Sequence, residues 1–141
     1  MKNIKSFTIN EITDDVMLLH EELKIDGEST TLALKICSNC DGKDIGMLYF
    51  NFGYYVLAHR VCTESLASKF ADKIAELTNA NNFVYGMPFY SMESDFIKWY
   101  IDSNRLFETD AKGLIHFVAY SETFYYEFIL NSLPEISFVR V

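Results

Sequence analysis

Apolar and polar positions alternate along much of the first 60 residues, and this alternation is the pattern of half-buried antiparallel strands. Within Val16–Ile36, two such runs flank the turn dipeptide Asp26-Gly27, which predicts a β-hairpin. A helix over Asp14–Leu23, with Thr13 as its N-cap, is the alternative for the first of the two runs.

A second pair of runs, Gly46–Phe52 and Tyr54–Arg60, is rich in aromatic and β-branched residues and joined at Gly53. We expect a second hairpin here, packed on the first. After Cys62 the period changes, and apolar residues recur at helical spacing: Leu66, Phe70, Ile74 and Leu77. This spacing predicts a helix over Thr63–Thr78, with Thr63 as its N-cap.

The segment Phe83–Tyr90 contains Gly86 and Pro88, which favour an irregular or edge segment. Ser91 or Ser94 can then cap a helix with apolar residues on more than one side. These residues are Phe96, Ile97, Trp99, Tyr100 and Ile101.

The C-terminal part has the pattern of a strand, a helix and a second strand. We expect a strand over Leu114–Tyr120, a helix over Ser121–Leu133 that Pro134 ends, and a strand over Ile136–Val141. The last strand can return parallel to its predecessor through a right-handed crossover.

These elements predict an α+β fold, predominantly an antiparallel sheet with two or three helices. The 141 residues contain no Pro/Gly-rich linker, so we expect a single domain over 1–141. The N-terminus lacks the apolar stretch of a secretory signal, and the most apolar region, Leu48–Ala58, is broken by Asn51 and Gly53 and is too short to span a membrane. We therefore expect a cytoplasmic location, with reduced cysteines.

The formal net charge of −8 argues against nucleic acid as a partner, because phosphate binding requires lysine and arginine. A basic protein partner fits this charge better. The stretch from Glu11 to Glu28 contains one lysine, Lys24, and seven carboxylates: Glu11, Asp14, Asp15, Glu21, Glu22, Asp26 and Glu28.

The three cysteines and one histidine form a C-x2-C and H-x2-C set that resembles a zinc ribbon: Cys37, Cys40, His59 and Cys62. The second predicted hairpin would bring both pairs to one end of the sheet. Free cysteines that act as small hydrophobic residues are the favoured interpretation, so we expect no metal and no cofactor. A zinc-ribbon-like structural or regulatory module remains the alternative.

Catalytic motifs are missing from the sequence. There is no G-x-S-x-G elbow, no phosphate-binding loop and no G-x-G-x-x-G. His20, His59 and His116 lack a nucleophile at a recognisable spacing. We therefore expect a binding protein rather than an enzyme, with a small-ligand-binding domain as a further alternative.

One predicted helix and its flank combine carboxylates with large aromatic side chains, which are frequent interface anchors. We predict that these residues bind the partner: Glu93, Asp95, Trp99, Tyr100 and Asp102. The acidic stretch Glu11–Glu28 is the alternative surface.

The chain resembles the small immunity proteins of bacterial contact-dependent growth inhibition systems. The resemblance rests on its short acidic α+β profile, its acidic stretch and its aromatic and acidic ending from Leu114 to Val141. The resemblance implies an antitoxin that blocks the active site of a toxic nuclease domain. Nuclease domains are basic because their substrate is an anion, which agrees with the charge argument.

Overall fold

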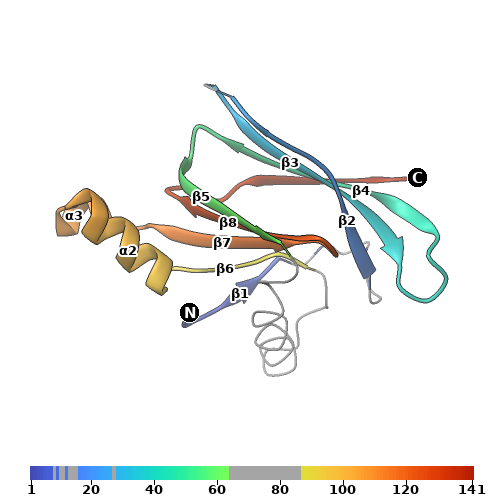
Figure 1. The fold of residues 1–141 in the computed structure, drawn as a ribbon, viewed down its shortest axis with the longest axis horizontal. Helices are drawn as coiled ribbons and strands as arrows, with labels where there is room; N and C mark the ends of the chain where they lie inside the picture. Colours follow the sequence, from blue (N-terminus) through green and yellow to red (C-terminus); the bar gives the residue numbers. More distant parts are fainter. Residues whose placement is uncertain (8, 10–11, 13–15, 27, 64–86) are drawn as a thin grey trace.

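The computed structural model describes residues 1–7, 9, 12, 16–26, 28–63 and 87–141. In this part of the chain, two antiparallel sheets lie in layers, with two helices beside one of them (Figure 1). The elements are β1 (Lys5–Ser6), β2 (Val16–Ile25), β3 (Thr30–Ser38), β4 (Asp44–Gly53), β5 (Val56–Thr63), β6 (Phe89–Ser91), α2 (Asp95–Asn104), α3 (Glu108–Ala111), β7 (Ile115–Tyr120), β8 (Phe124–Leu130) and β9 (Glu135–Arg140). The prediction of a mostly antiparallel α+β fold is confirmed.

The four-stranded sheet has the order β2-β3-β4-β9. Its first two strands form the predicted hairpin over Val16–Ile36, in which Leu18 pairs with Ile36 and Leu23 with Leu32. The alternative helix over Asp14–Leu23 is wrong from residue 16 onward, because alternate residues of this run enter a core between two sheets.

The five-stranded sheet has the order β1-β6-β7-β8-β5, and this order corrects the second predicted hairpin. Strands β4 and β5 do follow one another, but β4 pairs with β3 and β9, whereas β5 pairs with β8. Both edges of β4 are therefore occupied. Gly53, with φ 53°, lets the chain turn from one layer into the other.

The predicted helix over Ser121–Leu133 is also wrong, because residues 124–130 form strand β8. Ser121 caps a turn instead of a helix: its Oγ accepts hydrogen bonds from the backbone N–H groups of Thr123 (3.3 Å) and Phe124 (3.1 Å). Strands β7 and β8 thus form a hairpin, and β9 runs antiparallel to β4 rather than parallel to β7.

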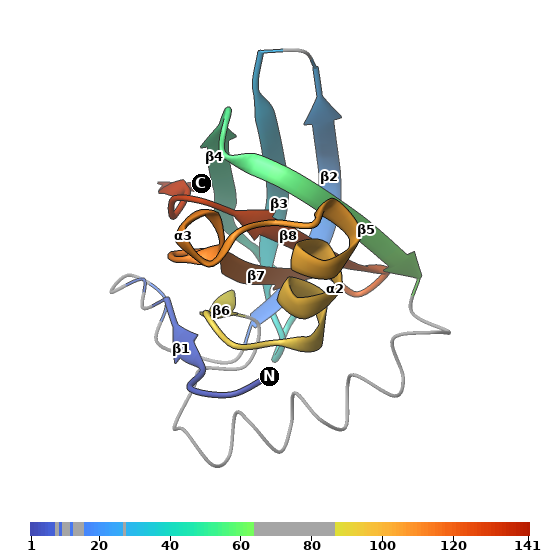
Figure 2. The same cartoon turned by 90° about the vertical axis from the view of Figure 1, so that its left-hand side faces the viewer.

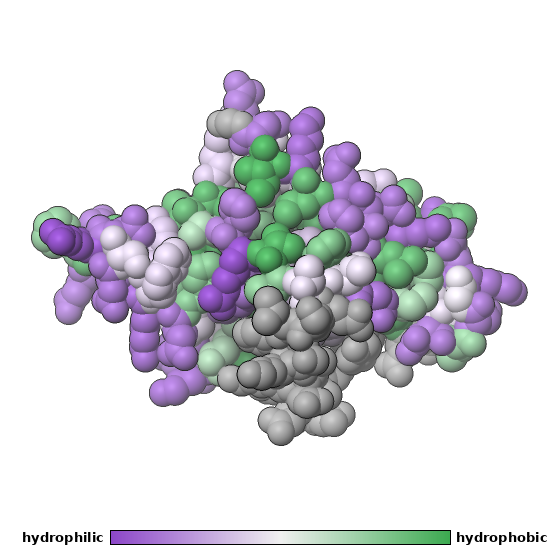
Figure 3. Space-filling view, viewed as in Figure 1, coloured by the Kyte–Doolittle hydropathy of each residue, from purple (hydrophilic) through white to green (hydrophobic). Residues whose placement is uncertain are grey.

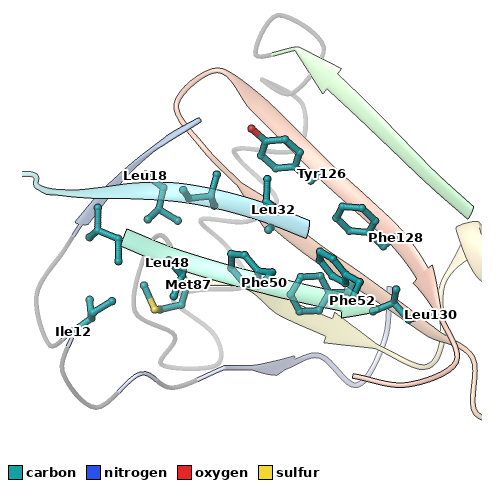
Figure 4. Packing of buried hydrophobic residues seen from close by; sticks show 14 of the residues in the cluster. Ile12, Leu18, Leu32, Leu48, Phe50, Phe52, Met87, Tyr126, Phe128 and Leu130 are labelled. Atoms are coloured by element: carbon teal, nitrogen blue, oxygen red, sulfur yellow. The ribbon is translucent and has the colours of Figure 1, made fainter. Parts of the chain in front are cut away.

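The main core lies between the two sheets and is rich in aromatic rings (Figure 4). The rings of Phe52 and Phe128, from opposite sheets, have centroids 4.4 Å apart, and Phe117 packs edge-on against Phe52 at 5.5 Å. All three side chains are fully buried. These contacts join the layers at the point where the chain crosses between them.

Two further predictions concern the segment that leads from β5 to β6. Thr63 ends β5, and the rest of the helix predicted over Thr63–Thr78 lies outside the described residues. Of Phe83–Tyr90, residues 87–90 are described, and β6 is not an edge strand because β1 and β7 pair with it on either side.

Gly46 is expected to be indispensable for the pairing of β4 with β9. A Cβ added there would overlap the carbonyl oxygen of Val139 and crowd the ring of Phe138, so the backbone of β9 would have to move. We expect Gly46→Ala to lower the free energy of unfolding by about 1–3 kcal/mol, the usual cost of overpacking. Urea denaturation measures this cost. Ser137→Ala, an exposed change in the same strand pair, is the control and should alter stability by less than about 0.5 kcal/mol.

Candidate partner-binding surface

Helix α2 begins where the sequence predicted a cap. Ser94 has an extended backbone, and its Oγ accepts a hydrogen bond from the backbone N–H of Ile97 (3.2 Å). Asp95 in the first turn interacts favourably with the helix dipole. Arg105 takes a left-handed conformation (φ 50°) and ends the helix. The helix lies across the outer face of the five-stranded sheet, beside β5 and below the β2–β3 hairpin in Figure 2.

One side of α2 faces solvent and the other is buried. Asp95, Lys98, Trp99 and Asp102 are exposed and lie on one stripe, because residues three or four apart share a helix face. On the opposite side Phe96 and Ile97 are buried in a small apolar cluster, to which β8 contributes Ile129. This burial holds the exposed stripe in a fixed position.

The five residues predicted to bind a partner do not all have the same exposure. Four of them are exposed: Glu93, Asp95, Trp99 and Asp102. Tyr100 is half-buried against the cluster below the helix. Glu93 lies just before the helix, where its Oε2 accepts a hydrogen bond from Asn3 Nδ2 (3.3 Å). The structure thus places Asp95, Asp102 and Trp99 on α2, with Glu93 just before the helix.

Trp99 is 55% exposed, yet it rests on an ordered base. Its ring centroid lies 5.6 Å from that of Phe96. Phe96 in turn contacts His116 edge-on at 5.2 Å, and the guanidinium carbon of Arg60 lies 4.1 Å from the centre of its ring. Trp99 is therefore an exposed aromatic group on a rigid support, which is the usual form of an interface anchor.

Below Phe96 lies a partly buried ion network that the sequence did not indicate, with Glu127 and His116 buried and Arg60 47% exposed. Glu127 is 4% exposed, and its carboxylate accepts hydrogen bonds from Arg60 Nε, from Arg60 Nη2 (2.9 Å) and from His116 Nε2 (2.9 Å). Burial acts to raise the pKa of Glu127, but the hydrogen bonds from His116 and Arg60 outweigh it, so the pKa is lowered. His116 Nδ1 is buried and has no partner among the described residues. The network fixes the sheet surface on which α2 lies.

The structure does not assemble the zinc-ribbon-like set. Cys37 lies in β3, where its thiol donates to Asp44 Oδ1 (3.4 Å), and Cys40 is exposed in the following turn. His59 and Cys62 lie in β5, in the other sheet. The expected hairpin that would have joined the two pairs is not formed. In the described part of the chain, no three His, Cys, Asp or Glu side chains are grouped so that they could hold a metal ion.

The alternative acidic surface is partly described. Glu21, Glu22, Asp26 and Glu28 are exposed at the far end of the β2–β3 hairpin, with Lys24 among them. The remaining carboxylates of the stretch, Glu11, Asp14 and Asp15, lie outside the described residues.

Two open hollows adjoin these surfaces. One of about 410 Å³ lies at the start of α2, where Lys2 and Lys98 accompany Glu93 and Asp95 in its lining. Its charges are therefore mixed. The other, of about 210 Å³, lies at the end of the β2–β3 hairpin and has a different lining, in which carboxylates occur without lysine or arginine.

A scan against protein-family models, a search of curated proteins and a search of solved structures each returned no match. None of the helices in the described residues is long and apolar enough to cross a membrane.

Replacing Glu127 with Gln should weaken the acid dependence of stability. The pKa of Glu127 is lower in the folded chain than its ordinary value of 4.5, so the carboxylate stabilises the fold above that pH. This contribution is lost as the pH falls through the folded-state pKa. Urea denaturation should show the free energy of unfolding falling more steeply from about pH 5 to about pH 3 in the wild type than in Glu127→Gln. Glu135→Gln, at an exposed carboxylate, should keep the wild-type slope. Equal slopes in all three proteins would contradict the network's role.

Proposed function

We propose that this protein is a toxin-neutralising immunity protein of a bacterium. It acts in the cytoplasm, has no enzymatic activity of its own, binds a basic nuclease toxin domain and blocks its active site. The observation that carries the proposal is the exposed Trp99 on the solvent face of α2, in line with the carboxylates of Asp95 and Asp102. An exposed aromatic group with carboxylates on each side suits a basic protein surface.

Energy and specificity come from different groups in such an interface. Trp99 offers a large apolar area on a rigid base, and desolvated aromatic anchors supply most of the binding energy in protein interfaces. The carboxylates contribute less to affinity because exposed charge pairs are screened by water. They favour a basic partner over an acidic one.

The net charge also supports the choice of partner. At −8 the chain repels nucleic acid and attracts a protein that has to bind an anionic substrate. An inhibitor that offers carboxylates where the nuclease binds phosphates would occupy the substrate groove. No chemistry by the immunity protein is needed for this mechanism.

Reversing the charge on α2 should slow association with the toxin domain encoded immediately upstream. We expect Asp95→Lys with Asp102→Lys to lower the association rate at low salt about tenfold, and to flatten its dependence on salt, because the steering field is reversed locally. Stopped-flow measurements at two salt concentrations test this, with survival of cells that express the toxin as the second measurement.

The matched control carries the same change of charge elsewhere. Asp41→Lys with Glu122→Lys alters two exposed carboxylates in turns on other elements. It should lower the rate less than the α2 variant does. Equal effects of the two variants would remove α2 from the interface, and no binding by any neighbouring gene product would refute the immunity function.

Trp99→Ala should act on dissociation instead. Loss of a central aromatic anchor costs about 2 kcal/mol or more, which corresponds to roughly a thirtyfold faster dissociation rate. The association rate should change little, since the charge is unaltered. Val139→Ala, at a residue that is also 55% exposed, is the control. An unchanged dissociation rate for Trp99→Ala would exclude Trp99 as the anchor.

A further inference from the structure

The smaller hollow lies between the end of the β2–β3 hairpin and the start of β5. Its volume of about 210 Å³ is below the roughly 300–1,000 Å³ of pockets that bind small molecules. One side is formed by residues 25, 26 and 28–30 of the hairpin, and the other by residues 53, 54 and 56–59 after the chain has crossed between the sheets. The space suits one side chain rather than a whole metabolite.

The walls of this hollow include exposed apolar side chains. Ile25 is 48% exposed, Leu57 38% and Tyr54 74%, and all three line the hollow. In Figure 3, hydrophobic side chains gather over β5 and the neighbouring part of β2, with hydrophilic side chains around them. A contiguous apolar patch with a polar rim marks an interaction site more often than scattered exposed residues do.

The charge in the lining has one sign. Among the described residues of the lining, Asp26 and Glu28 contribute carboxylates, and the one ionisable nitrogen-bearing side chain is that of His59. Lys24 lies next to the lining and interacts electrostatically with Asp26. Hydrogen bonds from the backbone N–H groups of Glu28 (2.9 Å) and Ser29 (2.7 Å) to Asp26 Oδ1 lower the pKa of Asp26. Asp26 is therefore ionised at neutral pH, and both backbone bonds hold its carboxylate in place.

We propose that this hollow receives an arginine or lysine side chain carried by an apolar segment of a basic protein partner. The proposal rests on the proposed function for the nature of that partner. Ile25 and Leu57 would contact the aliphatic part of the side chain, and the ring of Tyr54 and the carboxylates would contact its charged end. A second copy of this chain fits less well, because it brings the same negative charge.

Two peptides test the proposal without a known partner. The first is Gly-Leu-Arg-Val-Arg-Gly, and the second has citrulline in place of both arginines, which keeps the size and removes the charge. The full chain, labelled with ¹⁵N, is titrated with each peptide and followed by its amide resonances. We expect the arginine peptide to shift resonances of residues 25, 26, 28–30 and 53–59. The citrulline peptide should bind at least about fivefold more weakly.

Variants locate the binding within the molecule. Asp26→Asn with Glu28→Gln keeps the turn acceptor and removes both charges, so the arginine peptide should bind about fivefold more weakly. Asp41→Asn with Glu122→Gln, which removes two exposed carboxylates in turns outside the hollow, should leave its affinity within about twofold. Equal binding of both peptides, or shifts spread over every acidic surface, would overturn the proposal.

The outcome is separable from that of the proposed function. Peptide binding at the hollow, with no binding by the upstream gene product, would refute the immunity function and leave the docking site standing. The opposite result is that the toxin domain binds, the arginine peptide does not bind, and Asp26→Asn with Glu28→Gln leaves binding of the toxin domain unchanged. In that case the docking site is refuted and the proposed function stands.

Discussion

Strand β8 has protein on both faces and strands on both edges, and much of the described structure is arranged around it. On one face Tyr126, Phe128 and Leu130 enter the core between the sheets. On the other face Ile129 packs under α2, and Glu127 has to be buried in the same row. A buried carboxylate is costly unless it is paired. Arg60 from β5 and His116 from β7 supply that pairing, so one charged residue ties together the three strands beneath the helix.

Two cations of the sheets are engaged in ion pairs. Arg60 is held by Glu127, and Lys35 is paired with Asp44 at 2.9 Å on the four-stranded sheet. Neither is available to offset the carboxylates at the hairpin end or on α2. Both cations are partly exposed, at 47% and 33% of their side-chain surface, and each has its carboxylate partner within its own sheet.

The sequence predicted β2, β3 and α2 well because their patterns are local. The period-two alternation of β2 and β3, the Ser94 cap and the turn at Asp26 each act within a few residues. The sequence did not determine which strands pair with one another. The residues around Gly53 look like a hairpin, but whether β5 pairs with β4 or β8 depends on a strand 70 residues later. Residues 124–130 are apolar on almost every side, and such a run does not distinguish a buried strand from a buried helix.

The same limit applies to the candidate site. Helical spacing places Asp95, Trp99 and Asp102 on one face, but a helix with apolar residues on more than one side does not reveal which side is buried. The structure buries Phe96 and Ile97 and leaves Tyr100 at the margin of the buried face. The network of Arg60, His116 and Glu127 was missed because Glu127 was assigned to a helix. A turn at Ser121 would have placed His116 and Glu127 on the same face of adjacent strands.

The two candidate surfaces lie on either side of β5, which gives them a common geometry. The start of β5 lines the hollow at the hairpin end, and farther along the strand Arg60 lies over Phe96, the residue that supports Trp99. Ala58 lines the hollow and also packs in the apolar cluster with Phe96 under α2, so β5 contributes to both surfaces. A partner that spans the strand would meet carboxylates at both ends and apolar groups between them. Such an interface has an apolar centre and a charged rim. In specific interfaces the apolar centre supplies most of the affinity, and the charged rim raises the association rate.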